Sequence, residues 1–418
     1  MENIKKIAEK IYKAGGRLYL VGGAVRDKIL NKENHDEDYC VVGLLSEDFQ
    51  KLFPEAFIRG KSFEVFDLYG KEFAMARKEI KTGRKHSDFK IETNENITIY
   101  DDLKRRDLTI NAIAQDVLSG EIIDPYGGFQ DIKDKIIRAT SNAFLEDPLR
   151  VYRVARFSSK LEFEVEKKTI NMIHDLREEL QFLSAERVFD EFRKALSTRK
   201  PSLFFEVLKK ADVLDVHFKE IYDLIGSIQP QKYHPEGDSY NHTMLAVDKA
   251  SEITDKLEIR FGALVHDLGK GTTPKEMYPH HYGHDDRGVE LVQKFGNRLK
   301  MPSIWIKCGK VAAKEHMKGG IFDKMTPAKK VSFLEQISKS ALGLDGLEIV
   351  VEADRNCRGN KEEKIFFSQI GKNMIEEING KYIEEKYNIK PGIKFKEKLH
   401  EERVLWMKEF EKEEKSSN

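Results

Sequence analysis

Cysteine is scarce in this chain of 418 residues, and the three that are present, Cys40, Cys308 and Cys357, are far apart. An odd number of scattered thiols argues against a disulfide framework and indicates a reducing compartment. Long hydrophobic runs are also absent, because no apolar stretch approaches the roughly 18 residues of a membrane span. The N-terminal sequence MENIKKIAEKIYKAGG predicts a polar amphipathic helix and lacks the apolar core of a signal peptide. We therefore expect a cytoplasmic protein without membrane contact.

An excess of charge of one sign is missing too, since 72 Lys and Arg residues balance 72 Asp and Glu residues. A neutral total neither supports nor excludes a nucleic-acid partner, because local clusters of basic residues decide such binding. The candidate clusters are pairs on expected helices: Lys167 and Lys168, Arg193 and Lys194, Arg199 and Lys200, and Lys209 and Lys210. Hydrophobic residues make up 40% of the chain, which is enough to bury cores, and the length suggests about three domains.

The pattern of the chain changes near residue 138 and predicts an α+β protein. Short apolar segments before this point are expected as strands of one sheet, at residues 18–21, 39–42, 63–68, 73–76 and 112–117. The pattern after this point is helical, and residues 227–240, with two prolines and a glycine, are the best linker candidate. The expected divisions are a mixed head at residues 1–137, a helical neck and body at 138–226, a histidine-rich helical domain at 227–360 and a helical tail at 361–418.

The first candidate site lies near the N-terminus, where a strand expected at residues 18–21 is broken by Gly22 and Gly23 and followed by a helix. Glycines at such a turn let backbone N–H groups approach a phosphate closely. Asp36 and Asp38 follow at the head of the next apolar run, and side chains two apart share one face of a strand. Two such carboxylates beside a phosphate-binding turn favour a divalent-metal site for phosphoryl transfer.

Charged residues in two further segments support this interpretation. Lys104, Arg105 and Arg106 concentrate positive charge directly before an expected strand. The sequence EDPLRVYRVARF predicts a helix that Pro148 opens in its first turn. We expect Asp147 and Arg150 to share one face of that helix, because they are three residues apart, and Arg153 follows at the same spacing.

Histidine and aspartate residues cluster in the second half of the chain. His266 and Asp267 are adjacent in the apolar sequence ALVHDLG, where burial is costly without a metal or firm partners. Together with His242 and Asp354 they offer four nitrogen and oxygen ligands to one divalent metal. A second site would use His316 with either His281 or His284. Such ligands suit Ni²⁺, Co²⁺, Mn²⁺, Fe²⁺ or Zn²⁺.

Six motifs occur in order in the first half: LVGGAVRD, the DxD pair, KRRDLTINA, DPYGG, EDPLRVYRVARF and SAERVFDEF. With them the chain resembles the class II tRNA nucleotidyltransferases, the CCA-adding enzymes, which share a polymerase-β-like head with bacterial poly(A) polymerases. The segments HTML, ALVHDLGKG and HHYGH resemble the HD domain of the longer bacterial CCA-adding enzymes. The resemblance covers about residues 16–360. It implies a polymerase-β-like nucleotidyltransferase head, an all-α neck and body, and an α-helical HD domain.

The resemblance implies addition of C, C and A to the 3′ end of tRNA from CTP and ATP. The reaction would need no nucleic-acid template and would release pyrophosphate. Asp36 and Asp38 would be catalytic and would hold Mg²⁺. Gly23 would receive triphosphate oxygens through its backbone, and Arg26 would do so by charge.

Further roles are implied for the basic residues and for the neck. Arg106 and Arg153 would add contacts to the triphosphate or ribose. Asp147 and Arg150 would read the nucleobase, and the polar, basic residues 76–88 are expected as a mobile loop that changes the pocket from C to A selection. The HD domain would act as a phosphatase and cyclic phosphodiesterase with a divalent metal such as Ni²⁺, Co²⁺ or Mn²⁺. We expect a monomer or homodimer.

Two other interpretations remain open. One is a poly(A) polymerase or a partial tRNA enzyme that adds only CC or only A. The KRRDLTINA motif, the attached HD domain and the basic segment at residues 76–88 argue against it. The other is an RNA-binding phosphohydrolase whose head no longer polymerises. For the HD domain itself, the alternative to an active phosphohydrolase is a degenerate domain that serves only as a scaffold for the tRNA body. The intact pair Asp36 and Asp38 argues against an inactive head.

Overall fold

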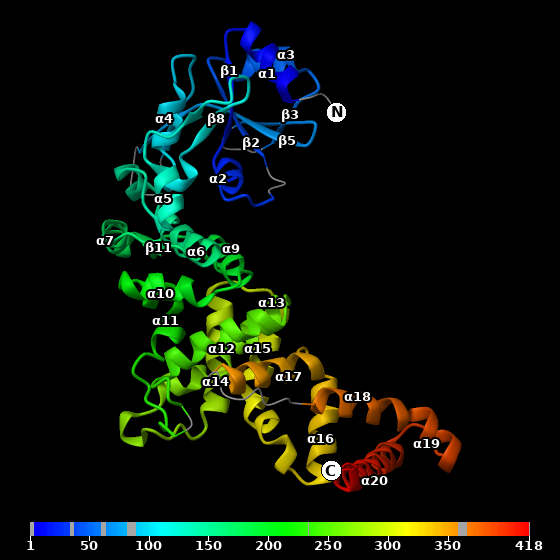
Figure 1. Ribbon diagram of the computed structural model, residues 1–418. Coiled ribbons are helices and arrows are strands. Elements are labelled where there is room, and N and C mark those ends of the chain that lie inside the picture. Colours follow the sequence, from blue (N-terminus) through cyan, green and yellow to red (C-terminus); the bar gives the residue numbers. More distant parts are fainter. Residues whose placement is uncertain are drawn as a thin grey trace. The chain divides into compact units, whose positions relative to one another are not determined.

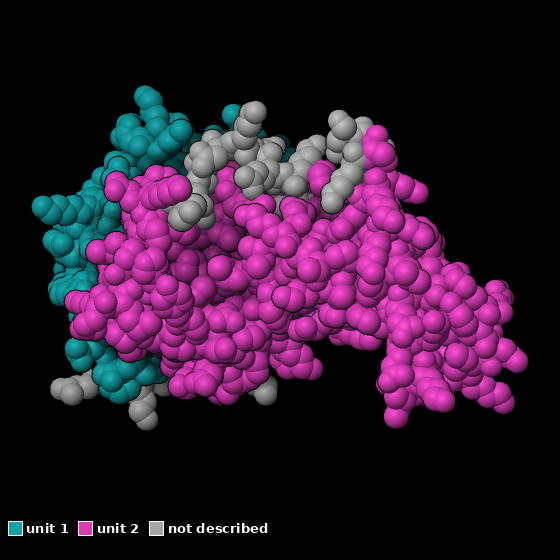
Figure 2. Space-filling view, turned by 90° about the horizontal axis from the view of Figure 1, so that it is seen from below, with its two compact units in different colours: residues 1–187, 203–216 teal, residues 188–202, 217–418 magenta. Residues whose placement is uncertain are grey.

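The computed structural model in Figure 1 describes residues 4–33, 37–59, 64–81, 89–232, 234–357 and 366–417. Two compact units make up the chain, and Figure 2 shows them in different colours. Unit 1 comprises Met1–Arg187 and Leu203–Val216, and unit 2 comprises Val188–Ser202 and His217–Asn418. The expected domain boundaries near residues 138, 227 and 361 stay predictions.

A seven-stranded mixed sheet forms the centre of unit 1, in the order β3-β4-β5-β2-β1-β8-β9. It contains all five strands expected from the sequence, so the prediction of a single sheet is confirmed. Its strands are β1 (Arg17–Val21), β2 (Asp38–Val42), β3 (Phe57–Arg59), β4 (Val65–Leu68), β5 (Lys71–Met75), β8 (Ala114–Asp116) and β9 (Ile122–Ile123). Strand β1 pairs antiparallel with β2, and β2 pairs parallel with β5.

Alternation along the strands builds a separate apolar core on each face of this sheet. Leu18 and Tyr39 face the core formed with helices α1 (Ile4–Lys13) and α3 (Ser46–Leu52). Tyr19 and Cys40 face the opposite core, which includes residues of α4 (Ile99–Lys104). The N-terminal amphipathic helix is thereby confirmed.

A separate two-stranded sheet corrects one expectation. Strands β6 (Lys78–Lys81) and β7 (Phe89–Glu92) pair antiparallel, with Lys78 opposite Glu92. The expected loop at residues 76–88 is therefore wrong over residues 78–81, which form a strand, and its residues 82–88 lie outside the described part of the chain. The loop prediction relied on the lack of apolar periodicity, whereas pairing with β7 makes residues 78–81 a strand, and Lys78 Nζ lies 3.0 Å from Asp101 Oδ1.

Helices account for most of the remaining described part of unit 1, as expected from the sequence. They are α2 (Gly23–Ile29), α5 (Gly128–Asp134), α6 (Arg150–Leu161), α7 (Lys167–Asp175), α8 (Arg177–Leu180) and α10 (Ser202–Lys210). The chain passes between the units within α9 (Ala185–Leu196), at the start of α10 and within α11 (Leu214–Tyr222). A short parallel pair of strands consists of β10 (Ile136–Ile137), which precedes α6 in the chain, and β11 (Glu164–Val165), which follows it.

Helices also dominate unit 2 (Figure 1). They are α12 (Ser239–Ile253), α13 (Leu257–Val265), α14 (His284–Arg298), α15 (Ser303–Gly320), α16 (Pro327–Ser338), α17 (Gly343–Asn356), α18 (Phe367–Glu377), α19 (Gly380–Tyr387) and α20 (Ile393–Ser417). An apolar core joins α15, α16, α17, α18 and α20 around Leu334 and Phe367. In the described ranges, none of the helices is long and apolar enough to cross a bilayer.

The linker expected at residues 227–240 instead belongs to unit 2, and the residues described at its two ends pack against the helices of that unit. Ser227 and Gln229 are buried, and the Ser227 hydroxyl donates a hydrogen bond to the Lys270 carbonyl at 3.1 Å. Ile228 forms a β-bridge with Asp238, which caps α12. This segment is therefore a fixed turn and not a flexible linker, because Ser227 and Asp238 connect it to neighbouring parts of unit 2.

Candidate active site and metal centre

The turn after β1 has the geometry expected for close approach to a phosphate. Gly22 has φ 69° and ψ −130°, and its N–H donates to the Ile113 carbonyl at 3.2 Å. A Cβ atom at Gly22 would lie 2.8 Å from Arg106 Nη1, so both the backbone conformation and the neighbouring guanidinium require glycine. Gly23 is the first residue of α2.

Asp38 begins β2 directly beside this turn. Its Cα pairs with Val21, the residue immediately before Gly22. Asp38 is exposed and shares a face with Cys40, whereas Glu37 hydrogen-bonds to Lys71 and to the Tyr39 hydroxyl. The expectation that Glu37 points to the opposite face is confirmed, and Asp36 lies outside the described residues.

Buried Asp102 holds two arginines near the turn. Its Oδ1 lies 2.6 Å from Arg105 Nη2, and its Oδ2 lies 3.0 Å from Arg106 Nη2. Burial alone would raise the pKa of Asp102, but the two guanidinium groups hold it below the ordinary value. Arg106 is therefore fixed with its Nη1 against Gly22.

A second network connects Arg26 with Arg153. Arg26 is only 2% exposed, and its Nη1 donates to Asn111 Oδ1 at 2.6 Å. Asn111 Nδ2 donates to Asp107 Oδ1 at 3.2 Å, and Arg153 Nε donates to Asp107 Oδ2 at 2.7 Å. Burial opposes ionisation of Asp107, yet Arg153, Asn111 and Arg150 lower its pKa from 3.8 to about 2.

The expected helical pairing of Asp147 with Arg150 is wrong. Asp147 has φ −122° and ψ 106° and precedes α6, which begins at Arg150. Pro148 accounts for this, because the residue before a proline is disfavoured in the helical region. Asp147 Oδ1 instead accepts from the Leu149 N–H at 3.0 Å, and its Oδ2 lies 3.6 Å from Arg187 Nη2.

Arg150 connects the start of α6 to the arginine segment. Its Nη1 donates to the Ala143 carbonyl at 2.5 Å, and its Nη2 donates to the Arg105 carbonyl at 2.6 Å. A guanidinium has five N–H donors, so other donors of Arg150 remain for a ligand. Arg105 in turn hydrogen-bonds to Asp102, which also holds Arg106. Arg150 is therefore connected through Arg105 and Asp102 to Arg106 and the glycine turn, whereas the Asp147 carboxylate contacts Leu149 and Arg187.

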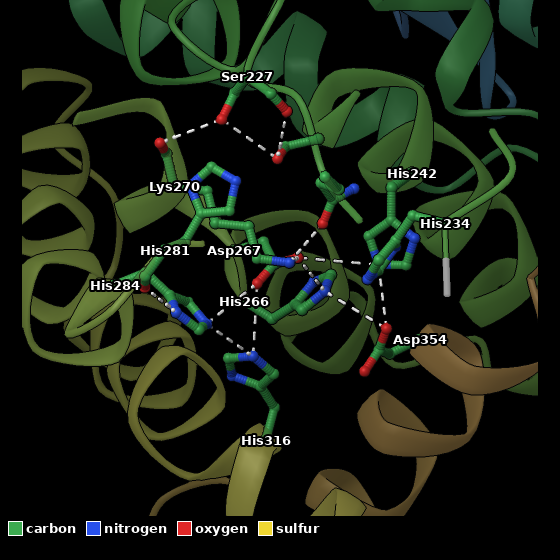
Figure 3. Close-up of polar contacts among 12 residues, drawn as sticks. Ser227, His234, His242, His266, Asp267, Lys270, His281, His284, His316 and Asp354 are labelled. Carbon is green, nitrogen blue, oxygen red and sulfur yellow. Dashed lines mark hydrogen bonds and ion pairs between the residues drawn. The ribbon is translucent and has the colours of Figure 1, made fainter. Parts of the chain in front are cut away.

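In unit 2, side chains from five helical segments converge on Asp267 (Figure 3). Two groups of donor atoms lie within 4.8 Å of one another: His242, His266 and Asp267 form one, and Asp267, His284 and His316 form the other. Asp267 Oδ1 is 3.4 Å from Nε2 of both His284 and His316. Its Oδ2 is 3.3 Å from His266 Nε2. Asp267 is thus shared by both groups.

Asp354, on α17, adds a further carboxylate to the first group. Its Oδ1 lies 3.0 Å from His242 Nε2 and 3.9 Å from His266 Nε2. His266 Nε2 and Asp267 Oδ1 are buried, but neither makes a hydrogen bond of regular geometry to the described residues. Imidazole nitrogens and carboxylate oxygens that converge in this way are ligands that suit a divalent metal.

Charges around Asp267 keep it ionised. Burial would raise its pKa, but Lys270 and His266 hold the pKa well below the ordinary value. Burial lowers the pKa of His284 to about 4, so this imidazole is neutral near pH 7 and able to bind a metal. Lys270 Nζ lies 2.6 Å from Asp267 Oδ2.

His281 does not belong to either group. Its Nδ1 lies 3.0 Å from the Thr273 hydroxyl and its Nε2 lies 3.0 Å from the Ile228 carbonyl. Of the two alternatives left by the sequence, the structure thus brings His284, and not His281, to His316 and Asp267.

The comparisons agree with both halves of this arrangement. Residues 18–138 match the family model of the poly(A) polymerase head domain, residues 162–224 match a probable RNA- and SrmB-binding site of polymerase A, and residues 239–353 match the HD domain. The multifunctional CCA protein of Shewanella denitrificans is 46% identical over 313 residues, which is 72% of this chain and 74% of that protein. The chain belongs to the multifunctional CCA protein family.

Solved structures share the fold of this family member. A CCA-adding enzyme in complex with ATP has a TM-score of 0.65 at 18% identity, covering 97% of this chain and 90% of that one. The Thermotoga maritima CCA-adding enzyme complexed with tRNA has a TM-score of 0.64 at 18% identity, covering 96% and 90%. The polymerase-type head and the helical HD domain expected from the sequence are therefore confirmed, and the family match confirms the nucleotidyltransferase class.

Several polar residues near these sites were missed by the sequence analysis. In unit 1 they are Asp102, Asp107 and Asn111, which hold the predicted arginines. In unit 2, Glu236 Oε1 lies 2.8 Å from His242 Nδ1 and 2.9 Å from His234 Nδ1, and the three form another group of potential ligands. Asp107 and Glu236 lie outside regular helices and strands, and Asp102 is one of several acidic residues in and around the short helix α4, so no periodic pattern singled these residues out.

Proposed function

We propose that this chain adds C, C and A to the 3′ end of tRNA from CTP and ATP without a template, releasing pyrophosphate. The observation that carries the proposal is the position of Asp38 on the strand beside Gly22, with Arg106 fixed against the same turn. A carboxylate, a phosphate-binding turn and an arginine then lie at one end of the sheet. Phosphoryl transfer requires this combination.

Asp36 and Asp38 would hold Mg²⁺. When bound, Mg²⁺ would lower the pKa of the tRNA 3′-hydroxyl and stabilise charge on the transferring phosphoryl group. Gly23 would contribute its backbone, and Arg106 would contribute a guanidinium, to the triphosphate. Arg26 is buried and hydrogen-bonded to Asn111, so we propose that it acts through its positive charge.

Arg153 would bind the triphosphate or ribose from a position fixed by Asp107. Its side chain is 36% exposed, whereas the Asp107 carboxylate behind it is 6% exposed. The buried carboxylate orients the guanidinium, and the exposed part of the guanidinium remains accessible to a substrate. A second arginine near the glycine turn would balance the charge of the triphosphate.

Asp147 and Arg150 would select the base by hydrogen-bond polarity. Cytosine and adenine both offer an amine donor beside a ring-nitrogen acceptor. A carboxylate accepts from the amine, and a guanidinium donates to the ring nitrogen. Uracil and guanine present a carbonyl beside an N–H, so they would leave both side chains unpaired. One pair can thus accept C and A and refuse U and G.

The test uses a tRNA that ends at the discriminator base. CTP alone should give addition of two nucleotides, ATP alone should give none, and CTP with ATP should give the complete CCA end. UTP and GTP should not be incorporated. A repeated A tail with ATP alone would instead identify a poly(A) polymerase. A product that still ends in CC when CTP and ATP are both present would identify a partial enzyme.

A second function, metal-dependent phosphoester hydrolysis, is proposed for unit 2. The observation that favours it is Asp267, which His266, His284 and His316 all approach within 3.4 Å. Ni²⁺, Co²⁺ or Mn²⁺ would supply a water nucleophile of lowered pKa when bound. Hydrolysis of a 2′,3′-cyclic phosphate across Ni²⁺, Co²⁺, Mn²⁺ and Mg²⁺ tests it. Inactivity with all four and no bound metal in elemental analysis would leave a scaffold role.

The tRNA body would meet the basic pairs of the helical region. In the described structure Lys194 lies 2.6 Å from Asp190, Lys209 lies 3.0 Å from Glu206 and Lys200 lies 3.4 Å from Asp248. The pair of Lys194 with Asp190 is exposed, and exposed ion pairs are weak and exchange readily for phosphate contacts. Addition of nucleotides should therefore become less efficient as the salt concentration rises.

A further inference from the structure

A pocket of about 450 Å³ opens beside the metal groups of unit 2. Its lining includes His284 of the second group and Lys270, which contacts Asp267. His280 and Tyr282 lie on another part of the wall. A volume of this size is within the range of small-molecule sites. The pocket therefore connects the metal groups with an aromatic rim.

The inner part of the pocket holds a buried hydrogen-bond donor without an acceptor. Gln229 is 3% exposed, and its Oε1 accepts from Lys270 Nζ at 2.6 Å. Because lysine can only donate, this contact fixes the amide with Nε2 as the remaining donor. Nε2 has no hydrogen-bond partner among the described residues. An anionic oxygen in the pocket would satisfy it and would also lie near the Lys270 ammonium.

The rim of the pocket carries two stacked aromatic rings. The His280 and Tyr282 ring centroids are 5.6 Å apart with an interplanar angle of 22°, and Tyr282 is 71% exposed. Arg287 Nη1 donates to the Tyr282 carbonyl at 2.7 Å, which fixes the backbone at this point. A rigid exposed pair of parallel rings offers a face on which a third flat ring can stack.

The two ends of the pocket are close enough for one nucleotide. The Ile228 carbonyl, one residue before Gln229, lies 3.0 Å from Nε2 of His281, one residue before Tyr282. A phosphate near Gln229 and Lys270 would thus lie within the length of a nucleotide from a base on the rings. The apolar lining residues Pro279 and Met317 suit the sugar and base and not a second anion.

For a nucleotide substrate of the proposed hydrolysis, we propose that Gln229 and Lys270 hold the phosphate and that the base stacks on Tyr282. The proposal rests on the phosphohydrolase function proposed for unit 2, for which the bound phosphoester would be the substrate. It assigns base selectivity to Tyr282 and His280 and phosphate binding to Gln229. The nucleotide can be free or can be the terminal residue of an RNA.

Two cyclic esters test the proposal in the full-length protein. Adenosine 2′,3′-cyclic phosphate carries a base, and glycerol 1,2-cyclic phosphate does not. With added Ni²⁺, Co²⁺ or Mn²⁺, Tyr282→Ala should raise the KM for the adenosine ester about tenfold with little change in kcat. The KM for the glycerol ester should not change. Tyr282→Phe should restore the KM, and Tyr222→Ala, an exposed tyrosine outside this pocket, should have no effect.

Gln229→Glu keeps the acceptor for Lys270 and replaces the donor by a negative charge. It should lower kcat/KM at least tenfold for both esters. The kcat/KM for an RNA that ends in a 2′,3′-cyclic phosphate, compared with that for the free nucleotide, shows which of the two is the preferred substrate. Equal effects of Tyr282→Ala on the adenosine and glycerol esters would overturn the assignment of base stacking.

Binding of adenosine 2′-monophosphate, measured by calorimetry, separates this proposal from the hydrolytic function. If no ester is hydrolysed but Tyr282→Ala and Gln229→Glu both weaken binding, the pocket assignment stands and the phosphohydrolase proposal fails. If the wild-type protein binds no nucleotide, or if neither variant alters binding, the pocket assignment is overturned.

Discussion

Neighbouring acidic residues at the start of β2 have different surroundings. Glu37 contacts Lys71 and Tyr39, and although burial raises its pKa, these hydrogen bonds lower it below the ordinary value. Asp38 is exposed on the opposite face, beside the glycine turn. The difference follows from strand alternation and makes Glu37 a matched control for Asp38.

Asp38→Ala should abolish nucleotide addition, because a single remaining carboxylate would not hold the catalytic metals in line. Asp36→Ala should have the same effect. Glu37→Gln should retain activity, since it alters only the contact with Lys71 on the other face. Product length on a tRNA lacking its CCA end measures all three. Normal turnover by Asp38→Ala, with HD activity as a check on folding, would refute the assignment.

Selectivity at Asp147 can be tested without disturbing the turn that it caps. Asp147→Asn keeps an oxygen for the Leu149 N–H but can offer a donor to the base. This variant and Asp147→Ala should lose about 1–3 kcal/mol of discrimination per lost hydrogen bond and incorporate more UTP and GTP. Single-nucleotide incorporation rates measure the effect. An equal loss of rate with all four nucleotides would show that Asp147 positions something else.

Because of the Asp107 carboxylate in the arginine network, the free energy of unfolding of unit 1 should depend on pH in acid. The pKa of Asp107 falls from 3.8 to about 2 in the fold, so this carboxylate stabilises the native state above about pH 4 by about 2 kcal/mol. This stabilisation is lost as the pH falls through about 2. Asp107→Asn should therefore lower the free energy of unfolding of unit 1 at pH 7, and the deficit should shrink between about pH 4 and pH 2.

Unfolding of unit 1 needs a local probe, because both tryptophans, Trp305 and Trp406, belong to unit 2. Proteolytic cleavage after a urea pulse, with pepsin at low pH and thermolysin at pH 7, supplies one. Asp175→Asn, at an exposed position of α7, is the surface control. A deficit that stays constant down to pH 2 would contradict the role of the Asp107 charge.

At the scale of elements, the local sequence pattern was sufficient to predict a strand or helix where one face of that element is apolar. The strand–glycine–helix order at β1 and α2 and the strand β2 could be read directly, because their residues alternate or follow turn chemistry. Strand β6 could not, since its stability comes from β7, which begins eight positions beyond its last residue. Asp147 was misplaced because Pro148 overrides helical spacing.

The same limits apply to the metal centre. Residue types alone pointed to His242, His266, Asp267, His316 and Asp354, because so many ligands in apolar helices need a common partner. The choice of His284 over His281 depends on backbone geometry, since the Ile228 carbonyl and Thr273 occupy both nitrogens of His281. Only the folded turn at residues 227–240 brings this carbonyl there.

The hairpin β6–β7 is the element for which we predict a partial reaction. Shortening residues 76–88 should leave the two C additions intact and block the addition of A, because only the second specificity would need a change of pocket shape. The product of the variant with CTP and ATP, resolved at single-nucleotide length, should end in CC. A control that exchanges Lys78 for Glu should weaken the pairing with Glu92 without shortening the chain. Complete CCA ends after the deletion would remove the hairpin from the mechanism.

At the scale of the whole molecule, each candidate site lies within one unit. Asp38, Gly22, Arg106 and Arg153 belong to unit 1, and all members of the His and Asp groups belong to unit 2. No described side chain is shared by the two sites. The chemistry of the sites should therefore be separable, even though the chain passes between the units within α9, at the start of α10 and within α11.

Changes at the metal centre should consequently remove hydrolysis and leave nucleotide addition nearly unchanged. His266→Ala with Asp267→Ala deletes two buried ligands, so Asp267→Asn is a second variant that preserves the volume of the side chain. Both should lose bound metal in elemental analysis and lose hydrolysis of 2′,3′-cyclic phosphate with Ni²⁺, Co²⁺ or Mn²⁺, because Asp267 joins both ligand groups. CCA addition with Mg²⁺ should remain within about twofold of the wild type. If Asp267→Asn keeps its fold but loses both activities in parallel, the two sites are coupled and the separation between the units does not extend to their chemistry.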